Sequence, residues 1–307
     1  MIRNVIVTGG TGFIGGWLIE YLLSQKVRVC AVVRSKERLL PAFFYNPDFT
    51  YIEKGIEELT PVDFKETDYD CIYHLAWDGV STENKNDYLL QLKNINVAMH
   101  IMDIAKSIGC RKLISAGTVA EYVFSGGVMD FSMKQTPNDF YGAAKVSTHY
   151  FLDVHSNRLD YPYIWAVLPS TFGERRADNN IITYTIRELL NKRIPQYGTL
   201  DQMWDFLYIS DVVRALYLLG MFGKHNTTYG IGSGKFRTLL EYILTIRDII
   251  DPSLPIDIGV KKYNTKQLMS SCVDINELVM DTGFKPEVSF EEGIKKTILY
   301  MKQRMDL

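Results

Sequence analysis

The amino-acid sequence predicts an α/β protein with a doubly wound parallel sheet and a smaller C-terminal lobe. The N-terminal stretch has the pattern of a buried strand, a glycine-rich turn and an amphipathic helix. Strands and helices then alternate as far as Leu168, which is the pattern of right-handed βαβ units. Beyond Pro169 the alternation loosens, and segments containing proline and glycine lengthen. These three observations place the sheet first and the lobe after it.

Composition limits the partners and the compartment. The 307 residues are enough for one large domain with a subdomain, or for two modest domains. With a net charge of −2 and a pI near 6.2, the chain has no global basic field, so we expect neither nucleic acid nor a membrane surface as a partner. The cysteines form no C-x-x-C pair, which favours reduced thiols and no bound metal. Together with a strand that begins at residue 2, this predicts a cytoplasmic protein.

The first predicted strand, over residues 2–8, ends in a glycine cluster. Gly9, Gly12 and Gly15 follow, with two residues between each pair. Glycine is needed where the backbone has a positive φ, lies against a pyrophosphate, or brings a helix close to its strand. The helix predicted over 13–23 then presents unpaired N–H groups to an anion. The turn predicts a dinucleotide phosphate site, although such a turn can also serve only to reverse the chain.

The second predicted strand, over residues 26–33, bears on the choice of cofactor. An acidic residue at the end of this strand binds the ribose 2′-hydroxyl of NAD, whereas an arginine suits the 2′-phosphate of NADP. Here Arg34 follows the strand and no acid stands at its tip. The sequence therefore favours NADP(H), with NAD(H) still possible; the alternative is that Arg34 belongs to an ordinary solvated loop.

The remaining elements complete the sheet and build the lobe. Further strands are predicted over 49–54, 70–76, 112–116 and 163–168, with helices over 88–108 and 139–159. Later helices are predicted over 180–192, 211–219, 239–250, 274–281 and 290–302, and strands over 204–209 and 228–231. The predicted division is a dinucleotide-binding domain of residues 1–168 plus 205–231, and a substrate-binding lobe of 169–204 plus 232–307.

Tyr141 and Lys145 lie four residues apart at the start of the helix that follows the fifth strand. Residues at this spacing share a helix face, so the ammonium of Lys145 is expected to lower the phenol pKa of Tyr141. This spacing arises by chance about once in such a chain, so its position carries the argument. The fifth strand leads into Thr118, whose hydroxyl is expected to meet Tyr141 at the carboxyl edge of the sheet.

The chain resembles the extended short-chain dehydrogenase/reductases of the nucleotide-sugar epimerase/dehydratase/reductase group, which have a Rossmann-type fold. The resemblance runs in order over nearly the whole chain. Its matching pieces are residues 8–15, 74–76, 96–97, Tyr141-x-x-x-Lys145, 204–212, 229–234, 283–286 and 292–294.

The resemblance implies a role for particular residues. Catalysis would fall to Tyr141 as acid/base, to Lys145 and to Thr118. The cofactor would be bound by Gly9, Thr11, Gly12, Phe13, Ile14, Gly15, Arg34, Leu75, Ala76 and Lys145. The substrate would be contacted by Thr118, Tyr141 and Ser170. From their places in the loops after the fourth and sixth strands, Ser81, Asn179 and Asn180 are further candidates for substrate binding, with an ordinary solvated surface as the alternative. Simpler structural roles remain open for several of these, such as a strand-end cap for Thr118.

Departures from the family pattern narrow the chemistry. Sugar-nucleotide 4,6-dehydratases resemble one another in carrying Asp-Glu after the catalytic Thr, whereas Val119 and Ala120 stand here. This sequence therefore lacks the acid/base pair that a 4,6-dehydratase needs. Trp204 replaces an arginine that often grips the diphosphate, and Ser170 replaces an asparagine that often touches substrate. These changes leave the hydride chemistry intact and put the substrate's identity in doubt.

We therefore expect an NADP(H)-dependent reductase of a keto-deoxy sugar nucleotide, acting at C4 with Tyr141 as proton donor. The alternatives are an NAD(P)-dependent nucleotide-sugar 4-epimerase, a reductase of a small non-sugar ketone and, in another class, a non-catalytic NADP-binding regulator. Apolar residues at helical spacing over 92–108 and 146–159 predict a homodimer through a four-helix bundle, as the family would imply; alternatively they only cover the sheet.

Overall fold

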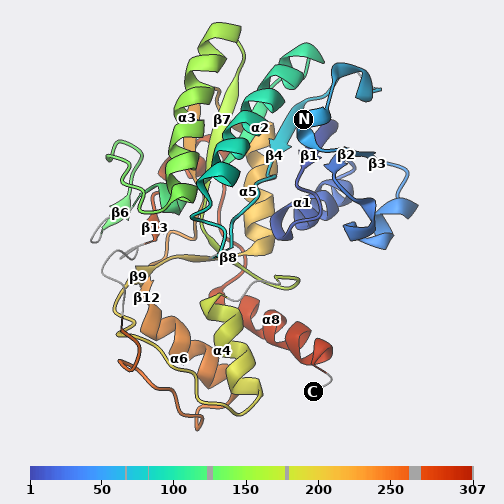
Figure 1. The fold of residues 1–307 in the computed structure, drawn as a ribbon. Coiled ribbons are helices and arrows are strands. Elements are labelled where there is room, and N and C mark those ends of the chain that lie inside the picture. The colour runs from blue at the N-terminus through green and yellow to red at the C-terminus, as the bar shows by residue number, and fades with distance from the viewer. Residues whose placement is uncertain (66–67, 82, 123–126, 177–179, 263–270, 306–307) are drawn as a thin grey trace.

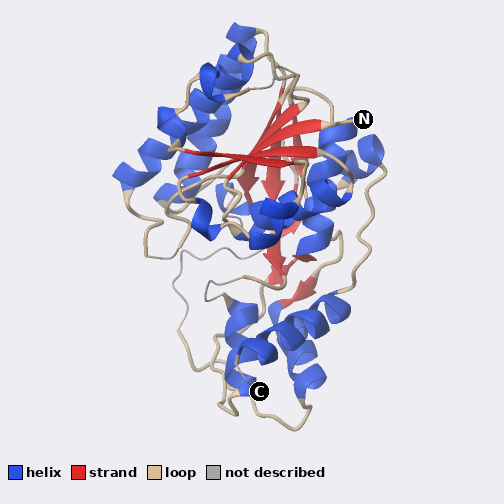
Figure 2. Cartoon of the chain, turned by 90° about the vertical axis from the view of Figure 1, so that its right-hand side faces the viewer, coloured by secondary structure: helices blue, strands red, loops and turns tan. Residues whose placement is uncertain are grey.

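The computed structural model describes residues 1–65, 68–81, 83–122, 127–176, 180–262 and 271–305. Within these residues, the centre of the fold is a seven-stranded parallel sheet with helices on both faces (Figures 1 and 2). The prediction of a Rossmann-type doubly wound sheet is confirmed. In spatial order the strands are β11 (Thr227–Gly230), β7 (Tyr163–Leu168), β5 (Leu113–Thr118), β4 (Cys71–His74), β1 (Asn4–Thr8), β2 (Arg28–Val33) and β3 (Phe49–Glu53).

The central strands are apolar on both faces because helices bury both. In β1, Val5 and Val7 belong to one hydrophobic cluster and Ile6, between them, belongs to the other. Two pairs of packed helices supply the other sides of these clusters (Figure 1). They are α1 (Phe13–Ser24) with α5 (Ile209–Phe222), and α2 (Tyr88–Ser107) with α3 (Phe140–Leu159).

Three longer helices pack together beyond the sheet (Figures 1 and 2). They are α4 (Ile181–Leu190), α6 (Leu239–Ile250) and α8 (Phe290–Arg304), while α7 (Asn276–Thr282) contacts α5 and β11. Short strand pairs lie around them: β8 (Ser170–Phe172) with β10 (Phe206–Tyr208), β9 (Met203–Trp204) with β12 (Arg237–Thr238), and β6 (Val128–Met129) with β13 (Cys272–Val273). Short 3-10 helices span Lys36–Arg38, Pro41–Tyr45, Ile56–Glu58, Pro61–Asp63 and Val119–Glu121.

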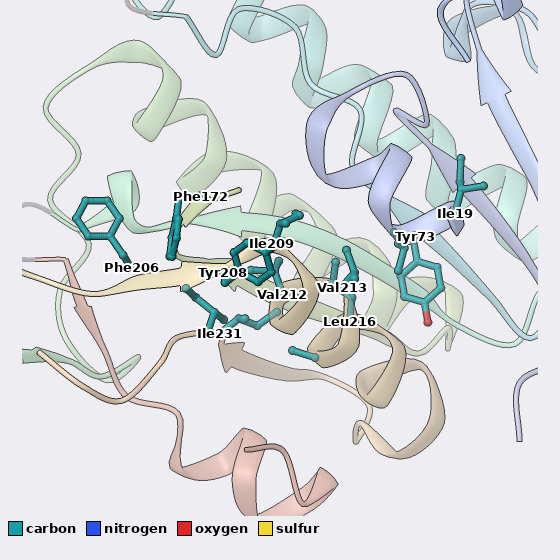
Figure 3. Close-up of a cluster of buried hydrophobic side chains, with 14 of the residues drawn as sticks. Ile19, Tyr73, Phe172, Phe206, Tyr208, Ile209, Val212, Val213, Leu216 and Ile231 are labelled. Carbon is teal, nitrogen blue, oxygen red and sulfur yellow. The ribbon is translucent and has the colours of Figure 1, made fainter. Parts of the chain in front are cut away.

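Aromatic side chains join these helices to the end of the sheet. The ring of Tyr242 on α6 lies 4.5 Å from Phe290 on α8 and 4.9 Å from Phe206 on β10, centroid to centroid. Phe172 on β8 lies 5.1 Å from Phe290. The buried cluster continues along α5 towards Tyr73 (Figure 3). The lobe and the sheet therefore share one hydrophobic core, so the division into two domains stays a prediction.

The strand predicted over residues 204–209 is wrong as a single element. It breaks at Asp205, whose fully buried carboxylate accepts backbone hydrogen bonds from Ser233 and Gly234 at 2.9–3.3 Å. These bonds turn the chain between β9 and β10, which pair with different strands. Among the described residues, no helix is both long enough and apolar enough to span a membrane.

Candidate active site

The register of the sheet brings three loops to one edge. Thr8 at the end of β1 lies opposite His74 at the end of β4, and His74 lies opposite Ser115 of β5. Because the strands are parallel, the segments that follow them leave from the same edge. The glycine turn, the segment after His74 and the chain around Thr118 are therefore neighbours.

The glycine turn lies directly against the chain that follows β4. Gly9 has φ +75°, and a Cβ placed on it would lie 2.8 Å from the amide nitrogen of Ala76. A Cβ on Gly15 would lie 2.2 Å from the carbonyl oxygen of Gly9, so the start of α1 packs on the turn. Gly12 caps α1 without a side chain, and the first turn of the helix holds no acidic residue. The N–H groups of this turn can therefore face an anion, which fits a pyrophosphate.

A cleft of about 420 Å³ opens beside the turn. Its volume is in the range of cofactor sites in proteins. Several of the predicted cofactor and substrate residues line it, while Phe13 and Ile14 lie half-buried at the start of α1. The predicted residues that line the cleft are Gly9, Thr11, Gly12, Arg34, Leu75, Ala76 and Ser81.

Arg34 is exposed and lines this cleft. It forms an ion pair that could not be predicted from the sequence. Its guanidinium makes two hydrogen bonds, of 2.8 and 3.0 Å, to the carboxylate of Asp78. Arg38 lines the same cleft and is exposed. The mouth of the cleft thus carries two guanidinium groups, one of them paired with an acid from the loop after β4.

Thr118 and Tyr141 meet at the sheet edge, as the sequence predicted. Their side chains share a hydrogen bond. Asp139 begins α3 by accepting a bond of 2.7 Å from the amide of Gly142. A Cβ on Gly142 would lie 2.4 Å from the carbonyl oxygen of Ala120. Only glycine allows this approach, which brings the start of α3 against the segment after Thr118.

The expected effect of Lys145 on Tyr141 is wrong for this arrangement. Burial raises the pKa of Tyr141 to about 12, although the hydrogen bond with Thr118 opposes the rise. The ammonium of Lys145 donates instead to the carbonyl oxygen of Ala116, at 2.7 Å, and lies 3.6 Å from the ring centre of Trp77. Burial lowers the pKa of Lys145 itself.

Trp77 is a site residue that sequence reasoning missed. Its ring covers Lys145, stands edge-on to Tyr141 at 6.1 Å and also lines the cleft. The indole N–H donates to Gln91 of α2 at 2.9 Å, and Asn94 holds the neighbouring backbone. The available signal was a large aromatic residue directly after His74-Leu75-Ala76, at the edge where ligands bind. A cofactor that reaches Lys145 must share this space with the indole.

The predicted substrate residues of the lobe make structural contacts. The hydroxyl of Ser170 accepts a hydrogen bond of 2.8 Å from the indole of Trp204 and lies 3.4 Å from the hydroxyl of Ser271. The side-chain oxygen of Asn180 caps α4 through the amides of residues 182 and 183. Asn179 lies outside the described residues. Substrate binding by these residues stays a prediction.

Two larger clefts, of about 640 and 540 Å³, lie beside β11, which is an edge strand of the sheet. Thr227, Thr228 and Phe131 line both of them. Tyr141 lines none of the three clefts, but only the smaller one is lined by the glycine turn and by Trp77, whose ring stands edge-on to Tyr141. The smaller cleft is therefore the one that fits the predicted cofactor.

The fold and this site define an extended short-chain dehydrogenase/reductase. The model of the NAD dependent epimerase/dehydratase family matches residues 5–232. The chain belongs to that family, as its sequence motifs predicted.

The chain is similar to enzymes of known activity and to proteins of known structure. It is 27% identical to the dTDP-4-dehydro-6-deoxyglucose reductase of Escherichia coli, over 96% of both chains. It is 24% identical to the dTDP-glucose 4,6-dehydratase of Haemophilus influenzae, over 97% of both. The structure of UDP-glucuronic acid 4-epimerase from Bacillus cereus, solved with UDP-glucuronic acid and NAD, superposes with a TM-score of 0.88 at 22% identity, covering 98% of this chain and 100% of that one. That likeness shows the shared fold.

Replacing Gly142 with alanine tests how the site is assembled. The added methyl meets the carbonyl of Ala120, so we expect the free energy of unfolding to fall by about 1–3 kcal/mol. We also expect the variant to lose the contact between α3 and the segment after Thr118. Urea unfolding measures the loss. The matched control is Gly16→Ala in α1, where the new Cβ has ordinary contacts; it should stabilise the helix by about 0.5–1 kcal/mol. Equal effects at both positions would contradict the close approach.

Proposed function

We propose that the protein is an NADP(H)-dependent reductase of a keto-deoxy sugar nucleotide and acts at C4. The observation that carries the proposal is the hydrogen-bonded pair of Thr118 and Tyr141, beside buried Lys145, at the sheet edge that holds the glycine turn. The similarity to an enzyme named for the reduction of a 4-dehydro-6-deoxy sugar nucleotide supports this choice of substrate class.

The site residues suit the donation of a proton to a ketone oxygen. A bound reduced nicotinamide cofactor supplies the hydride in this chemistry. Because the pKa of Tyr141 is about 12, its phenol is protonated at neutral pH and is a proton donor rather than a base. Thr118 contributes a hydroxyl and Lys145 an ammonium to the negative charge that develops on the oxygen.

The neighbourhood of Thr118 argues against dehydration. Val119 and Ala120 provide no carboxylate where 4,6-dehydratases carry Asp-Glu. Glu121, the remaining residue of this short helix, is fully buried and bonded to the protein. The residues after Thr118 therefore provide no acid/base pair for the removal of water across C5 and C6 of the sugar.

The same cleft suits NADP. Gly9, Gly12 and Gly15 would hold the pyrophosphate, and the backbones of Leu75 and Ala76 would pass beneath the cofactor. Arg34 and Arg38, both at the mouth of the cleft, would bind the 2′-phosphate. Asp78 already pairs with Arg34, so the phosphate would compete with this carboxylate.

Tyr141→Phe separates an enzyme from a cofactor-binding regulator. Loss of the donated proton should lower turnover of a 4-keto-6-deoxy sugar nucleotide by about 10²–10⁴-fold while NADPH binding persists. The assay is the fall in NADPH absorbance, with Tyr45→Phe as control, because Tyr45 is 88% exposed and does not line the cleft. Interconversion of sugars without net loss of NADPH would indicate the 4-epimerase. If neither the wild-type protein nor the Tyr141 variant turns over a sugar nucleotide, and both bind NADPH equally well, the regulator would be indicated.

Arg34→Ala tests the choice of cofactor. Loss of a charge-assisted contact should weaken NADPH binding by about 10- to 100-fold and leave NADH binding within about threefold. Fluorescence titration with both cofactors measures the difference. Lys36→Ala is the matched control, because Lys36 is an exposed cation in the next turn that does not line the cleft. Equal loss for the two cofactors would refute the 2′-phosphate role.

We further propose that a second copy of this chain covers the outer face of α2 and α3. These helices pack side by side, and large apolar side chains on both are more than half exposed: Leu89, Leu92, Phe151 and Val154. Light scattering should give twice the chain mass of 35.2 kDa for the protein and a single chain mass for Leu92→Glu or Phe151→Glu. Val62→Glu, at an exposed apolar residue elsewhere, should leave the dimer intact. A monomeric wild-type protein would contradict the proposal.

A further inference from the structure

A buried carboxylate lies next to Thr118, the hydrogen-bond partner of the proposed proton donor. Glu121 is 0% exposed and ends the short helix that follows Thr118. Its carboxylate accepts a hydrogen bond of 2.7 Å from the backbone amide of Thr118. The indole of Trp165 and the side-chain amide of Gln135 donate to it at 3.3 Å. Four contacts with three donors fix its position, and one of these donors is the peptide that carries Thr118.

Glu121 and Lys145 are opposite charges in the same buried region. Lys145 is 4% exposed, and its ammonium lies 6.0 Å from the ring centre of Trp165, whose indole N–H bonds to Glu121. Burial lowers the pKa of Lys145, and the charge of Glu121 is what opposes this. Burial raises the pKa of Glu121, and the charge of Lys145 opposes this too. Each group therefore favours the charged form of the other.

The other titratable groups near the pair are three phenols and two histidines. Of the histidines, His149 stacks on the ring of Trp165 at 4.7 Å, and burial lowers its pKa. Tyr141 on α3, Tyr122 after the short helix and Tyr163 on β7 each feel the charge of Glu121. Burial raises the pKa of all three, so they are neutral at physiological pH. Burial also lowers the pKa of His74, which feels the charge of Lys145 and is neutral as well. None of these groups offers Lys145 a negative charge at pH 7.

We propose that Glu121 is a positioning residue of the reductase site, which holds the Thr118 peptide in place and keeps Lys145 charged. This role rests on the proposed function of Thr118 and Lys145. An ammonium in an apolar environment loses its hydration and tends to release its proton. A fixed carboxylate within the same low-dielectric region offsets that loss, and Gln135 and Trp165 help to fix the carboxylate by donating hydrogen bonds to it. Lys145 thus keeps more of its charge than burial alone would leave it.

Glu121→Gln is the direct test, because glutamine keeps the size and the acceptor for Thr118 while removing the charge. With lysine labelled at the ε carbon, NMR follows the titration of Lys145, identified by the signal that Lys145→Met removes. The apparent pKa of Lys145 should fall by at least about one unit in Glu121→Gln, which is a tenfold weaker hold on the proton. An unchanged Lys145 pKa would overturn the proposal.

Two further variants separate charge from packing. Gln135→Ala removes a neutral donor to the same carboxylate, so the pKa of Lys145 should stay within a few tenths of a unit. Glu121→Asp keeps the charge, so it should restore most of the Lys145 pKa even if glutamine is poorly tolerated at this position. A similar fall in all three variants would mean that packing, and not charge, acts on Lys145, and would also overturn the proposal.

The titration needs no substrate, so its result is independent of the reductase assay. If the pKa shift occurs and the protein turns over no keto sugar, the charge relation stands and the proposed function fails. If turnover occurs, the alkaline limb of its pH profile should move to lower pH in Glu121→Gln, because Lys145 loses its proton earlier. A profile that keeps its position while turnover falls would assign Glu121 a merely structural role.

Discussion

The parallel register of the central sheet is the constraint on which the site depends. β1 and β4 end opposite each other and β5 ends only three residues further along, so the glycine turn, the segment after His74 and the chain around Thr118 cannot lie far apart. α3 then has to approach this edge closely enough for Tyr141 to reach Thr118, and Gly142 makes room for that approach. Residues more than a hundred positions apart in sequence meet because backbone geometry leaves them little choice.

Burial gives this edge its chemical character. In water a tyrosine and a lysine differ little in pKa, and neither is poised for one direction of proton transfer. Here the low-dielectric surroundings raise the pKa of Tyr141 and lower that of Lys145, so the phenol becomes the firmer holder of its proton. Trp77 contributes by covering the ammonium, and its own position is fixed from α2. The packing that stabilises the fold therefore also sets the electrostatics of the site.

Much of this could be predicted from the sequence because local patterns carry it. Apolar strand segments, the glycine spacing and the Tyr141–Lys145 interval are short-range signals, and their order along the chain implied the sheet edge at which Thr118 and Tyr141 meet. The pairing of Arg34 with Asp78 could not be predicted, because it joins loops 44 residues apart whose geometry only the folded sheet defines. The pKa of Tyr141 was misjudged since the helical interval gives the position of Lys145 and not the direction of its ammonium, which turns to Ala116 and Trp77. Asp205 broke a predicted strand through contacts made far along the chain.

A crystal structure of the protein with NADPH would test the account most directly, because it would show whether the cleft and the three site residues form one site. The account predicts the pyrophosphate on the glycine turn and the nicotinamide end beside Tyr141, with Lys145 turned from the Trp77 ring to the cofactor's ribose. A cofactor whose nicotinamide end points away from Tyr141, with Trp77 still covering Lys145, would contradict it.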